Sequence, residues 1–290
     1  MKISTGLPMS AKSIDVVMLT KNSNKWYFRR VLAAIKREIP VHHFIVVDRY
    51  STDGTIDVIR EFFGNRVVVI KTDAPLGGAR YIGMKAVDTE WFAFIDSDVE
   101  ILPGWFKQGL KYMKNRKIWG IQGGFSGRSE TRDILLKSPR LYFSLHVILR
   151  HGIVKFYGAD TSHVILRRCV VDLVDPHTFY HLDCGEDAYI AWKIVESGHL
   201  YVKTSKMLAR HYAMPRLALV KSFYRSIRRN GIFYAVPYSE YTLSNLIRLL
   251  TSFYRRDVFT ALTYLINIMG SAISYLRTKR TLLSTKLLKT

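Results

Sequence analysis

The sequence predicts an α/β protein with a mostly parallel sheet and helices on both faces. Strand and helix signals alternate four times in the first third of the chain, and polar or glycine-rich turns follow the strands. With 290 residues, 48% hydrophobic and 23% charged, the chain is globular and long enough for one large domain plus an appendage. A sheet of this kind places its ligand site at the carboxyl ends of its parallel strands.

The first two repeats follow this pattern closely. Residues 14–19 form an apolar strand signal, and residues 25–37 follow a polar turn and place their apolar side chains on one helical face. A second strand over 44–47 ends at Asp48, and a helix is expected over 51–63. Asp48 is therefore placed at the ligand-binding edge of the sheet.

The next two repeats lead to a pair of carboxylates. A third strand is expected over 67–70, and the helix after it begins at Gly77. The fourth strand, 91–95, is short, aromatic-rich and buried in character, and it ends at Asp96 and Asp98.

Asp96 and Asp98 lie two residues apart, so both carboxylates can reach one ion at the end of a strand. In phosphate chemistry a divalent cation is usually held by one or two carboxylates, and its other positions are left for substrate phosphates. The alternative is a polar turn before Pro103. The pair is thus a candidate site for Mn²⁺ or Mg²⁺.

Further along, strands are expected over 118–124 and 162–166, and a helix over 185–195. That helix carries Glu186 and Asp187 in its first turn. Acids at this position complement the helix dipole by about 0.3–1 kcal/mol each, which is the alternative to a catalytic role.

Two common nucleotide-binding motifs are missing from the sequence. It contains no G-x-x-x-x-G-K-[ST] loop, which argues against a P-loop NTPase. Gly77 and Gly78 do not form G-x-G-x-x-G, and they follow the third strand rather than the first, which argues against a dinucleotide-binding fold.

Five motifs between Ile14 and Tyr212 resemble those of the GT-A glycosyltransferases of family 2. They are Thr20-Lys21-Asn22, Asp48-Arg49-Tyr50-Ser51-Thr52-Asp53-Gly54-Thr55, Ala79-Arg80-Tyr81-Ile82-Gly83, Asp96-Ser97-Asp98 and Gly185-Glu186-Asp187. Five motifs in this order are far more specific than any one alone. The resemblance implies the GT-A fold of nucleotide-diphospho-sugar transferases, with a Rossmann-like mixed sheet and helices on both faces.

The resemblance also implies how the donor binds. Thr20, Asn22 and Asp48 would border the nucleoside, and Asp48 would accept hydrogen bonds from its base or ribose. Arg80, near a helix N-terminus, would contact the diphosphate side of the donor. Many relatives carry Asp and Gly where Arg49 and Tyr50 stand here, so the base specificity stays open.

For catalysis, the resemblance implies that Asp98, with Asp96, binds a divalent metal ion that bridges the donor diphosphate. In inverting members the second acid of the Glu-Asp pair is the general base, here Asp187, with Glu186 assisting. His211 matches a position where some members place a third metal ligand, and a structural histidine is the alternative. A lipid phosphate acceptor is already a nucleophile, and Asp187 would then have another role.

The formal charge of +21 calls for an anionic partner. Residues 201–290 contain sixteen Lys and Arg but only two acids, interleaved with apolar and aromatic residues. This composition is more typical of a membrane surface than of a nucleic-acid groove. No zinc-finger spacing, RNP-like strand or heptad favours nucleic acid, and a basic nucleic-acid-binding protein is kept as the alternative from another class.

The expected domains are a GT-A catalytic domain over 1–215 and a basic, amphipathic helical region over 216–290 that associates with a membrane. Residues 218–234 predict a basic helix that either contacts acceptor phosphates or is solvated surface. Residues 258–276 contain no charge over nineteen positions, but their polar side chains weaken insertion. A helix in the membrane plane is therefore favoured over a spanning helix or one packed on the domain.

The N-terminus lacks the apolar run of a signal peptide, and two cysteines indicate no disulfide framework. We therefore expect a cytoplasmic enzyme, peripheral or C-terminally anchored at the inner face of the cell membrane. Its expected activity is metal-dependent transfer of a sugar from a UDP- or GDP-sugar to a lipid-linked or glycan acceptor. A catalytically silent sugar-nucleotide binder is a further alternative.

Overall fold

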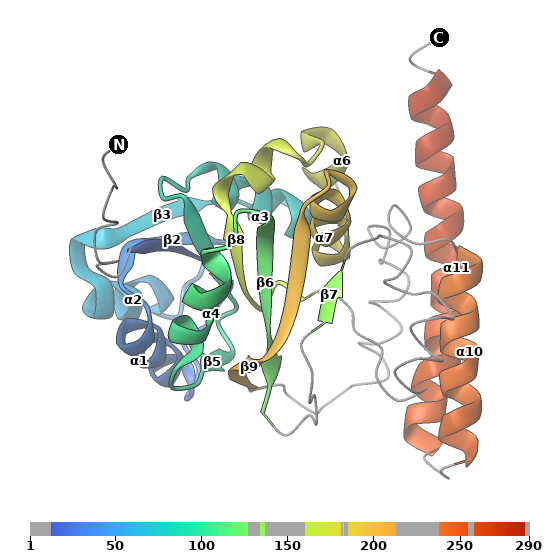
Figure 1. The fold of residues 1–290 in the computed structure, drawn as a ribbon, viewed down its shortest axis with the longest axis horizontal. Coiled ribbons are helices and arrows are strands. Elements are labelled where there is room, and N and C mark those ends of the chain that lie inside the picture. Colours follow the sequence, from blue (N-terminus) through green and yellow to red (C-terminus); the bar gives the residue numbers. More distant parts are fainter. Residues whose placement is uncertain are drawn as a thin grey trace, which may run out of the picture.

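A mixed sheet with helices on both faces forms the body of the protein in the computed structural model (Figure 1). The structure describes residues 13–126, 134–136, 160–180, 182, 185–212, 238–254 and 258–287. The strands are β1 (Ile14–Thr20), β2 (Val41–Asp48), β3 (Val67–Lys71), β4 (Trp91–Ile95), β5 (Val99–Ile101), β6 (Ile118–Phe125), β7 (Ile134–Leu136), β8 (His163–Arg167) and β9 (Leu200–His211). The helices are α1 (Phe28–Glu38), α2 (Thr55–Phe63), α3 (Leu76–Lys85), α4 (Trp105–Met113), α6 (Pro176–Tyr180), α7 (Glu186–Glu196), α10 (Tyr238–Tyr254) and α11 (Val258–Leu287), with two short 3-10 helices, η1 (Gly64–Arg66) and η3 (Arg168–Asp172).

The strand order is β3-β2-β1-β4-β8-β6-β9-β5, and β7 also pairs with β9. The first four strands are parallel, as predicted. β8 then runs antiparallel to both β4 and β6, whereas β9 is parallel to β6. The sheet is therefore parallel in its first half and mixed in its second, so the expectation of a mostly parallel sheet holds for one half only.

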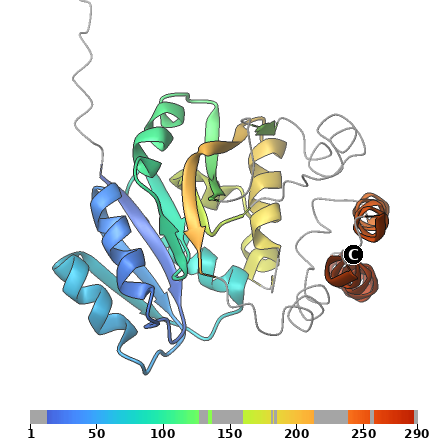
Figure 2. The ribbon, with the colours of Figure 1, turned by 90° about the horizontal axis from the view of Figure 1, so that it is seen from below.

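Two apolar cores cover the two faces of this sheet, because successive side chains of each strand point to opposite sides. On one face Val16 and Met18 of β1 pack in the core that contains α1, α2 and α4. On the other face Val17 packs in the core that contains α3, α6 and α7. The predicted helices on both faces are confirmed. Seen from below, the helices flank the sheet on either side (Figure 2).

Strand ends from both halves meet at one edge of the sheet. Thr20 pairs with Asp48 where β1 and β2 end, and β4 ends next to them at Ile95. Antiparallel β8 begins at this same edge, where His163 pairs with Ile95. The carboxyl ends of the parallel strands and the start of β8 therefore border one site.

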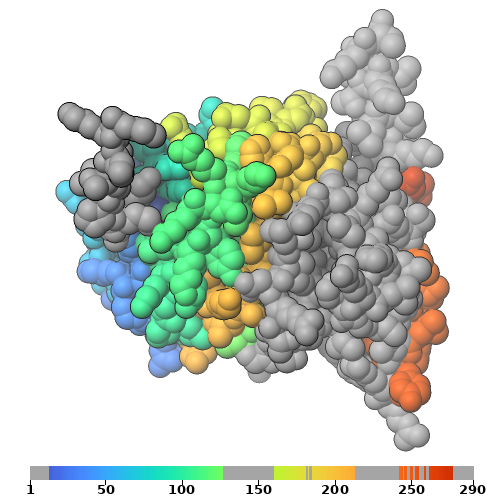
Figure 3. All heavy atoms as spheres, in the orientation of Figure 1, coloured from blue at the N-terminus to red at the C-terminus, as the bar shows by residue number. Residues whose placement is uncertain are grey.

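Five strands and helices of the second half have no counterpart among the predicted elements: β5, α4, β7, α6 and β9. β9 is the longest strand, with 12 residues, and pairs with β5, β6 and β7. In the space-filling view the green residues that precede 126 lie directly beside the yellow and orange residues of 160–212 (Figure 3). The two segments thus build one continuous half of the domain.

At the C-terminus α10 and α11 pack against each other, to one side of the sheet (Figures 1 and 2). The helical prediction for residues 258–276 is confirmed, since they lie within α11. The predicted basic helix over 218–234 lies outside the described residues. Among the helices that the structure describes, none combines the length and the apolar character that crossing a membrane requires.

Candidate active site

Arg80, in α3, links two of the sequence motifs at the edge of the sheet. Its Nε donates to Glu186 Oε1 at 2.9 Å, and its Nη2 donates to Asp96 Oδ1 at 3.2 Å. The guanidinium also lies over the ring of Phe94, with Cζ 4.9 Å from the ring centroid. Burial works against the charge of Arg80, but Asp96 and Glu186 raise its pKa. The end of β4 and the start of α7 are therefore held together by one buried cation.

Arg80 is buried because α3 approaches its neighbours closely. A Cβ on Gly77 would lie 2.1 Å from the carbonyl oxygen of Phe179, and a Cβ on Gly83 would lie 2.5 Å from Val17 Cγ1. Any larger residue at either position would push the helix outward. A buried charge pair of this kind is costly to break, since removing one partner usually costs about 3–5 kcal/mol.

Asp98 and His211 form a second pair beside this cluster. His211 Nε2 lies 3.3 Å from Asp98 Oδ2, and both side chains are partly exposed, at 37% and 36%. Pairing of β5 with β9 sets Val99 opposite His211. The hydrogen bond with Asp98 is the main cause that raises the pKa of His211. The structure thus brings together two of the three predicted metal ligands.

A surplus of carboxylates surrounds these groups. Burial raises the pKa of Asp96, the charges of Asp160 and Asp98 add to that effect, and Arg80 opposes it. Burial likewise raises the pKa of Asp187 well above its ordinary value, and the charges of Glu186 and Asp160 add to it. An electrostatic environment that disfavours carboxylate charge is one that a divalent cation would relieve.

The donor set therefore fits a hard divalent ion, with Asp98, Asp96 and His211 as its candidate ligands. The fit is not that of a closed metal cage. Asp96 Oδ1 accepts a hydrogen bond from Arg80. The ligand atoms of Asp98, Asp96 and His211 are also too far apart for all three to bind one ion without a change in side-chain position. Open positions of this kind suit an ion that is completed by substrate phosphates.

Asp187 begins α7, directly after Gly185, which has a left-handed backbone with φ of 86°. Its Oδ1 accepts a hydrogen bond of 2.7 Å from the backbone N–H of Ala188. The side chain is half-buried, whereas that of its neighbour Glu186 is buried and bonded to Arg80. The two acids of the predicted pair thus have different surroundings, with only Asp187 partly open to solvent.

Asp160 belongs to the same cluster and is absent from the predicted site residues. Its backbone N–H donates to Gln122 Oε1 at 3.0 Å, and the hydroxyl of Tyr201 donates to the same oxygen at 3.0 Å. Its charge raises the pKa of both Asp96 and Asp187. Asp160 precedes β8, so a search for acids that follow strands does not find it.

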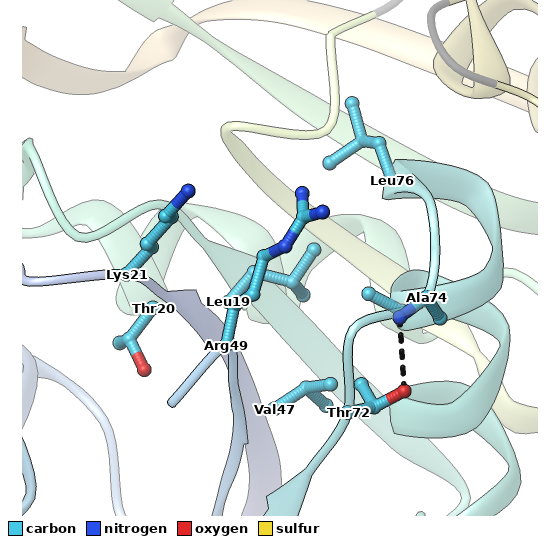
Figure 4. A pocket seen from close by; sticks show the side chains of 9 residues that line it. Leu19, Thr20, Lys21, Val47, Arg49, Thr72, Ala74 and Leu76 are labelled. Atoms are coloured by element: carbon cyan, nitrogen blue, oxygen red, sulfur yellow. Dashed lines mark hydrogen bonds between the residues drawn. The ribbon is translucent and has the colours of Figure 1, made fainter. Parts of the chain in front are cut away.

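A pocket of about 220 Å³ opens at the ends of β1, β2 and β3, beside the start of α3. Figure 4 shows the side chains of Lys21 and Arg49 extending on one side of it, with Leu76 across from them. Its lining residues are Leu19, Thr20, Lys21, Val47, Arg49, Thr72, Ala74, Leu76 and Ala79. The pocket combines apolar walls with two cations, which suits a flat base attached to an anionic group.

Of the predicted donor residues, Thr20 lines this pocket, while Asp48 and Asn22 hold its frame. Asp48 is fully buried, and its Oδ1 accepts from Thr20 Oγ1 and from Ser51 Oγ, each at 2.6 Å. Asn22 Oδ1 accepts from the backbone N–H of Thr52 at 2.9 Å. These bonds tie the loop after β1 to the loop after β2. Direct contact of Asp48, Asn22 or Arg80 with a donor stays a prediction.

Comparisons with known proteins point in one direction. The model of the family described as "Glycosyl transferase family 2" matches residues 15–163, just over half of the chain. A curated relative, the UDP-Glc:α-D-GlcNAc-diphosphoundecaprenol β-1,3-glucosyltransferase WfaP of Escherichia coli, is 22% identical over 202 residues, which cover 69% of this chain and 76% of that protein.

Among solved structures, mannosyltransferase PcManGT from Pyrobaculum calidifontis, in complex with GDP-Man and Mn²⁺, matches 99% of this chain and 84% of its own, with a TM-score of 0.55 at 14% identity. TarS of S. aureus matches 87% of this chain with a TM-score of 0.52 at 16% identity, and the match covers 55% of that longer chain. At these identities the structural likeness shows the fold, which is that of the GT-A enzymes.

Proposed function

This chain belongs to glycosyl transferase family 2 and is a glycosyltransferase with a nucleotide-sugar donor. On this basis we propose its donor, its acceptor class and its place of action. The enzyme moves a sugar from a UDP- or GDP-sugar to a lipid-linked or glycan acceptor, with a divalent metal ion, at the cytoplasmic face of the membrane. One observation carries the proposal: the pocket at the ends of β1–β3 lies on the same sheet edge as the Asp96, Asp98 and Asp187 carboxylates.

The order of groups along this edge matches the order of groups in a donor. The apolar pocket receives the base, and Lys21 and Arg49 at its rim offset the negative charge of the diphosphate. The end of β4, with Asp96 and Asp98, comes next along the edge. Asp98, Asp96 and His211 would hold Mn²⁺ or Mg²⁺ there, which supplies positive charge next to the leaving nucleoside diphosphate. Mn²⁺ accompanies GDP-Man in the P. calidifontis structure of the same fold.

The acceptor side of the site is the N-terminus of α7. Asp187 Oδ1 is held by the N–H of Ala188, and Oδ2 is the oxygen to which the proposal gives the role of base. We assign Asp187 the removal of the proton from an acceptor hydroxyl as that oxygen attacks the sugar. Glu186 and Asp96 both bond to Arg80, and these bonds hold the first turn of α7 beside the end of β4.

The donor proposal is tested by thermal unfolding of the full chain with UDP-, GDP- and dTDP-sugars, with and without Mn²⁺. One nucleotide class should raise the midpoint in a Mn²⁺-dependent way, since a ligand at 100 times its Kd stabilises the folded state by about 2.7 kcal/mol. Arg49→Ala should reduce this rise in the midpoint. Arg60→Ala, at an exposed position of α2, should leave it unchanged. If no nucleotide sugar shifts the midpoint under any condition, the proposed donor class is wrong.

The membrane part of the proposal rests on the inverted polarity of the C-terminal helices. Asn267, Ser271 and Ser274 of α11 are buried, and so is Asn245 of α10. Exposed apolar residues instead follow α11 at intervals of three or four positions. They are Val258, Leu262, Leu265, Met269, Ile273 and Leu276. Small polar residues between helices and apolar residues outside are typical of helices that contact lipid.

Flotation of the full chain with vesicles tests this contact. The protein should float with anionic vesicles and less with neutral ones, because a lysine or arginine near an anionic surface contributes about 1 kcal/mol. Met269→Glu, on the exposed stripe, should reduce flotation severalfold. Gln108→Glu on α4 adds the same charge elsewhere and should change little. Equal flotation of the two variants would contradict the proposed membrane face.

A further inference from the structure

Two consecutive histidines of β2 turn to the same carboxylate at the opposite edge of the sheet from the active site. Ile14 pairs with Val41, but Val16 pairs with Phe44, so Asp15 alone lies opposite both His42 and His43. A bulge of this kind redirects side chains that would otherwise alternate between the two faces. The two imidazole rings accordingly lie 4.0 Å apart between centroids.

The ligand atoms of Asp15, His42 and His43 lie at distances close to those in a tetrahedral metal site. His42 Nδ1 lies 3.0 Å from Asp15 Oδ1, and His43 Nδ1 lies 3.6 Å from that oxygen and 3.6 Å from Asp88 Oδ2. Tetrahedral Zn²⁺ with bonds of 2.0–2.1 Å places its ligand atoms about 3.3 Å apart. Within the described part of the chain, Asp15, His42 and His43 are the one group of three such residues with ligand atoms all within 4.8 Å.

Hydrogen bonding alone explains only part of this arrangement. At 3.0 Å, His42 makes an ordinary hydrogen bond to Asp15. His43 Nδ1 is too far from either carboxylate for a hydrogen bond, yet it is equally distant from both. A nitrogen at this distance from the Asp15 oxygen is suited to sharing a metal ion with it.

The Asp15 carboxylate is held in one orientation by its surroundings, as a metal ligand requires. Its side chain has no exposed surface, and its oxygens accept backbone N–H bonds from His43 at 2.9 Å, Asp88 at 2.7 Å and Thr89 at 3.1 Å. Carboxylate ligands are commonly oriented by such bonds. The two imidazoles are 42% and 33% exposed, and Asp88 is 67% exposed, so an ion can enter from solvent.

We propose that Asp15, His42 and His43 form a metal site at this edge of the sheet, which binds Zn²⁺ or a similar transition-metal ion and leaves its fourth position open to solvent. Two imidazole nitrogens and one carboxylate oxygen favour such an ion over Mg²⁺ or Mn²⁺, which prefer oxygen ligands. On binding, the metal takes the lone pair of His42 Nδ1, and the neutral imidazole carries its proton on Nε2 instead. The ion joins the starts of β1 and β2, so loading stabilises the sheet.

The site is tested by calorimetric titration of the chelator-treated full chain with Zn²⁺, in a His211→Gln background that removes the other histidine–aspartate pair. We expect one Zn²⁺ per chain. Co²⁺ at the site should show the strong visible absorption of tetrahedral coordination. Mg²⁺ should neither bind there nor compete.

Variants locate the bound ion. His43→Gln should lower the Zn²⁺ affinity by at least about tenfold, the lower range for disturbing a metal site, and abolish the Co²⁺ spectrum. Its unfolding midpoint without metal should equal that of the parent, since His43 is partly exposed and not hydrogen-bonded through its ring at these distances. His177→Gln, exposed on α6, should bind like the parent. No Zn²⁺ binding in the parent, or equal binding by the His43 variant, would overturn the proposal.

Discussion

Changing Asp98 to Asn is expected to lower kcat/KM for sugar transfer by on the order of 10³-fold, about 4 kcal/mol of transition-state stabilisation, while the fold is kept. Carboxylate and amide have nearly the same shape, and Asp98 is 36% exposed, so the substitution alters charge rather than packing. It removes the ionic partner of His211, 3.3 Å away, and the anionic ligand proposed for the metal. The developing charge of the leaving diphosphate would then lack its counter-charge.

This prediction is measured by steady-state transfer with the donor found by thermal unfolding, at saturating Mn²⁺. Mn²⁺-dependent stabilisation by that donor should disappear in the same variant. Asp57→Asn, on an exposed position of α2, makes the same chemical change away from the site and should leave transfer nearly unaltered. Wild-type turnover by the Asp98 variant would remove Asp98 from the proposed metal site.

The parallel half of the sheet was predictable because its signals are local. Each strand from β1 to β4 is a short apolar run that ends in a polar turn, and parallel strands bring those ends to one edge. Asp48 and the Asp96-Ser97-Asp98 motif could therefore be placed at the same edge from the sequence. The structure confirms this placement, with Thr20 opposite Asp48 and β4 next to β1.

The mixed half was less predictable because its pairings are between distant parts of the chain. β9 contains Lys203, Lys206 and Arg210, so it lacks the apolar run that marks a buried strand. Asp160 was missed for a related reason. An antiparallel strand brings its beginning, not its end, to the ligand edge, and only the pairing of β8 with β4 reveals this.

The position of Arg80 shows a third limit of sequence reasoning. The family resemblance predicts contact of Arg80 with the donor diphosphate, which stays a prediction. The resemblance does not indicate that this side chain is 5% exposed and bonded to Asp96 and Glu186. Gly77 lies where α3 comes close to a neighbouring segment. The neighbour is the segment around Phe179, whose place against α3 depends on the tertiary fold.

Replacing Asp187 with Asn is expected to lower kcat for a hydroxyl acceptor by about 10²–10⁴-fold, the usual contribution of general base catalysis. Donor binding should persist, because Arg80, Asp96 and the pocket at β1–β3 are unchanged. Thermal stabilisation by the donor is the measurement that separates the two effects. Glu196→Gln, on the exposed last turn of the same helix, is the matched control and should keep nearly full turnover.

The pH dependence gives an independent test of the same residue. A base works only when ionised, so the rate should rise with pH through the pKa of Asp187. Burial, followed by the charges of Glu186 and Asp160, raises that pKa, while Arg80 and the N–H of Ala188 lower it. The acidic limb should therefore lie above about pH 4, the ordinary range of an aspartate, and it should vanish from the residual activity of the Asn variant.

The two readouts together also distinguish the acceptor classes. With a hydroxyl acceptor, loss of Asp187 should slow transfer and remove the acidic limb, because proton removal accompanies attack on the sugar. A phosphate acceptor is already a nucleophile and needs no base, so the variant should retain its rate with that acceptor. Near-normal turnover with a hydroxyl acceptor would exclude the base role, and the carboxylate would then act on the charge balance around Asp96 and Asp160.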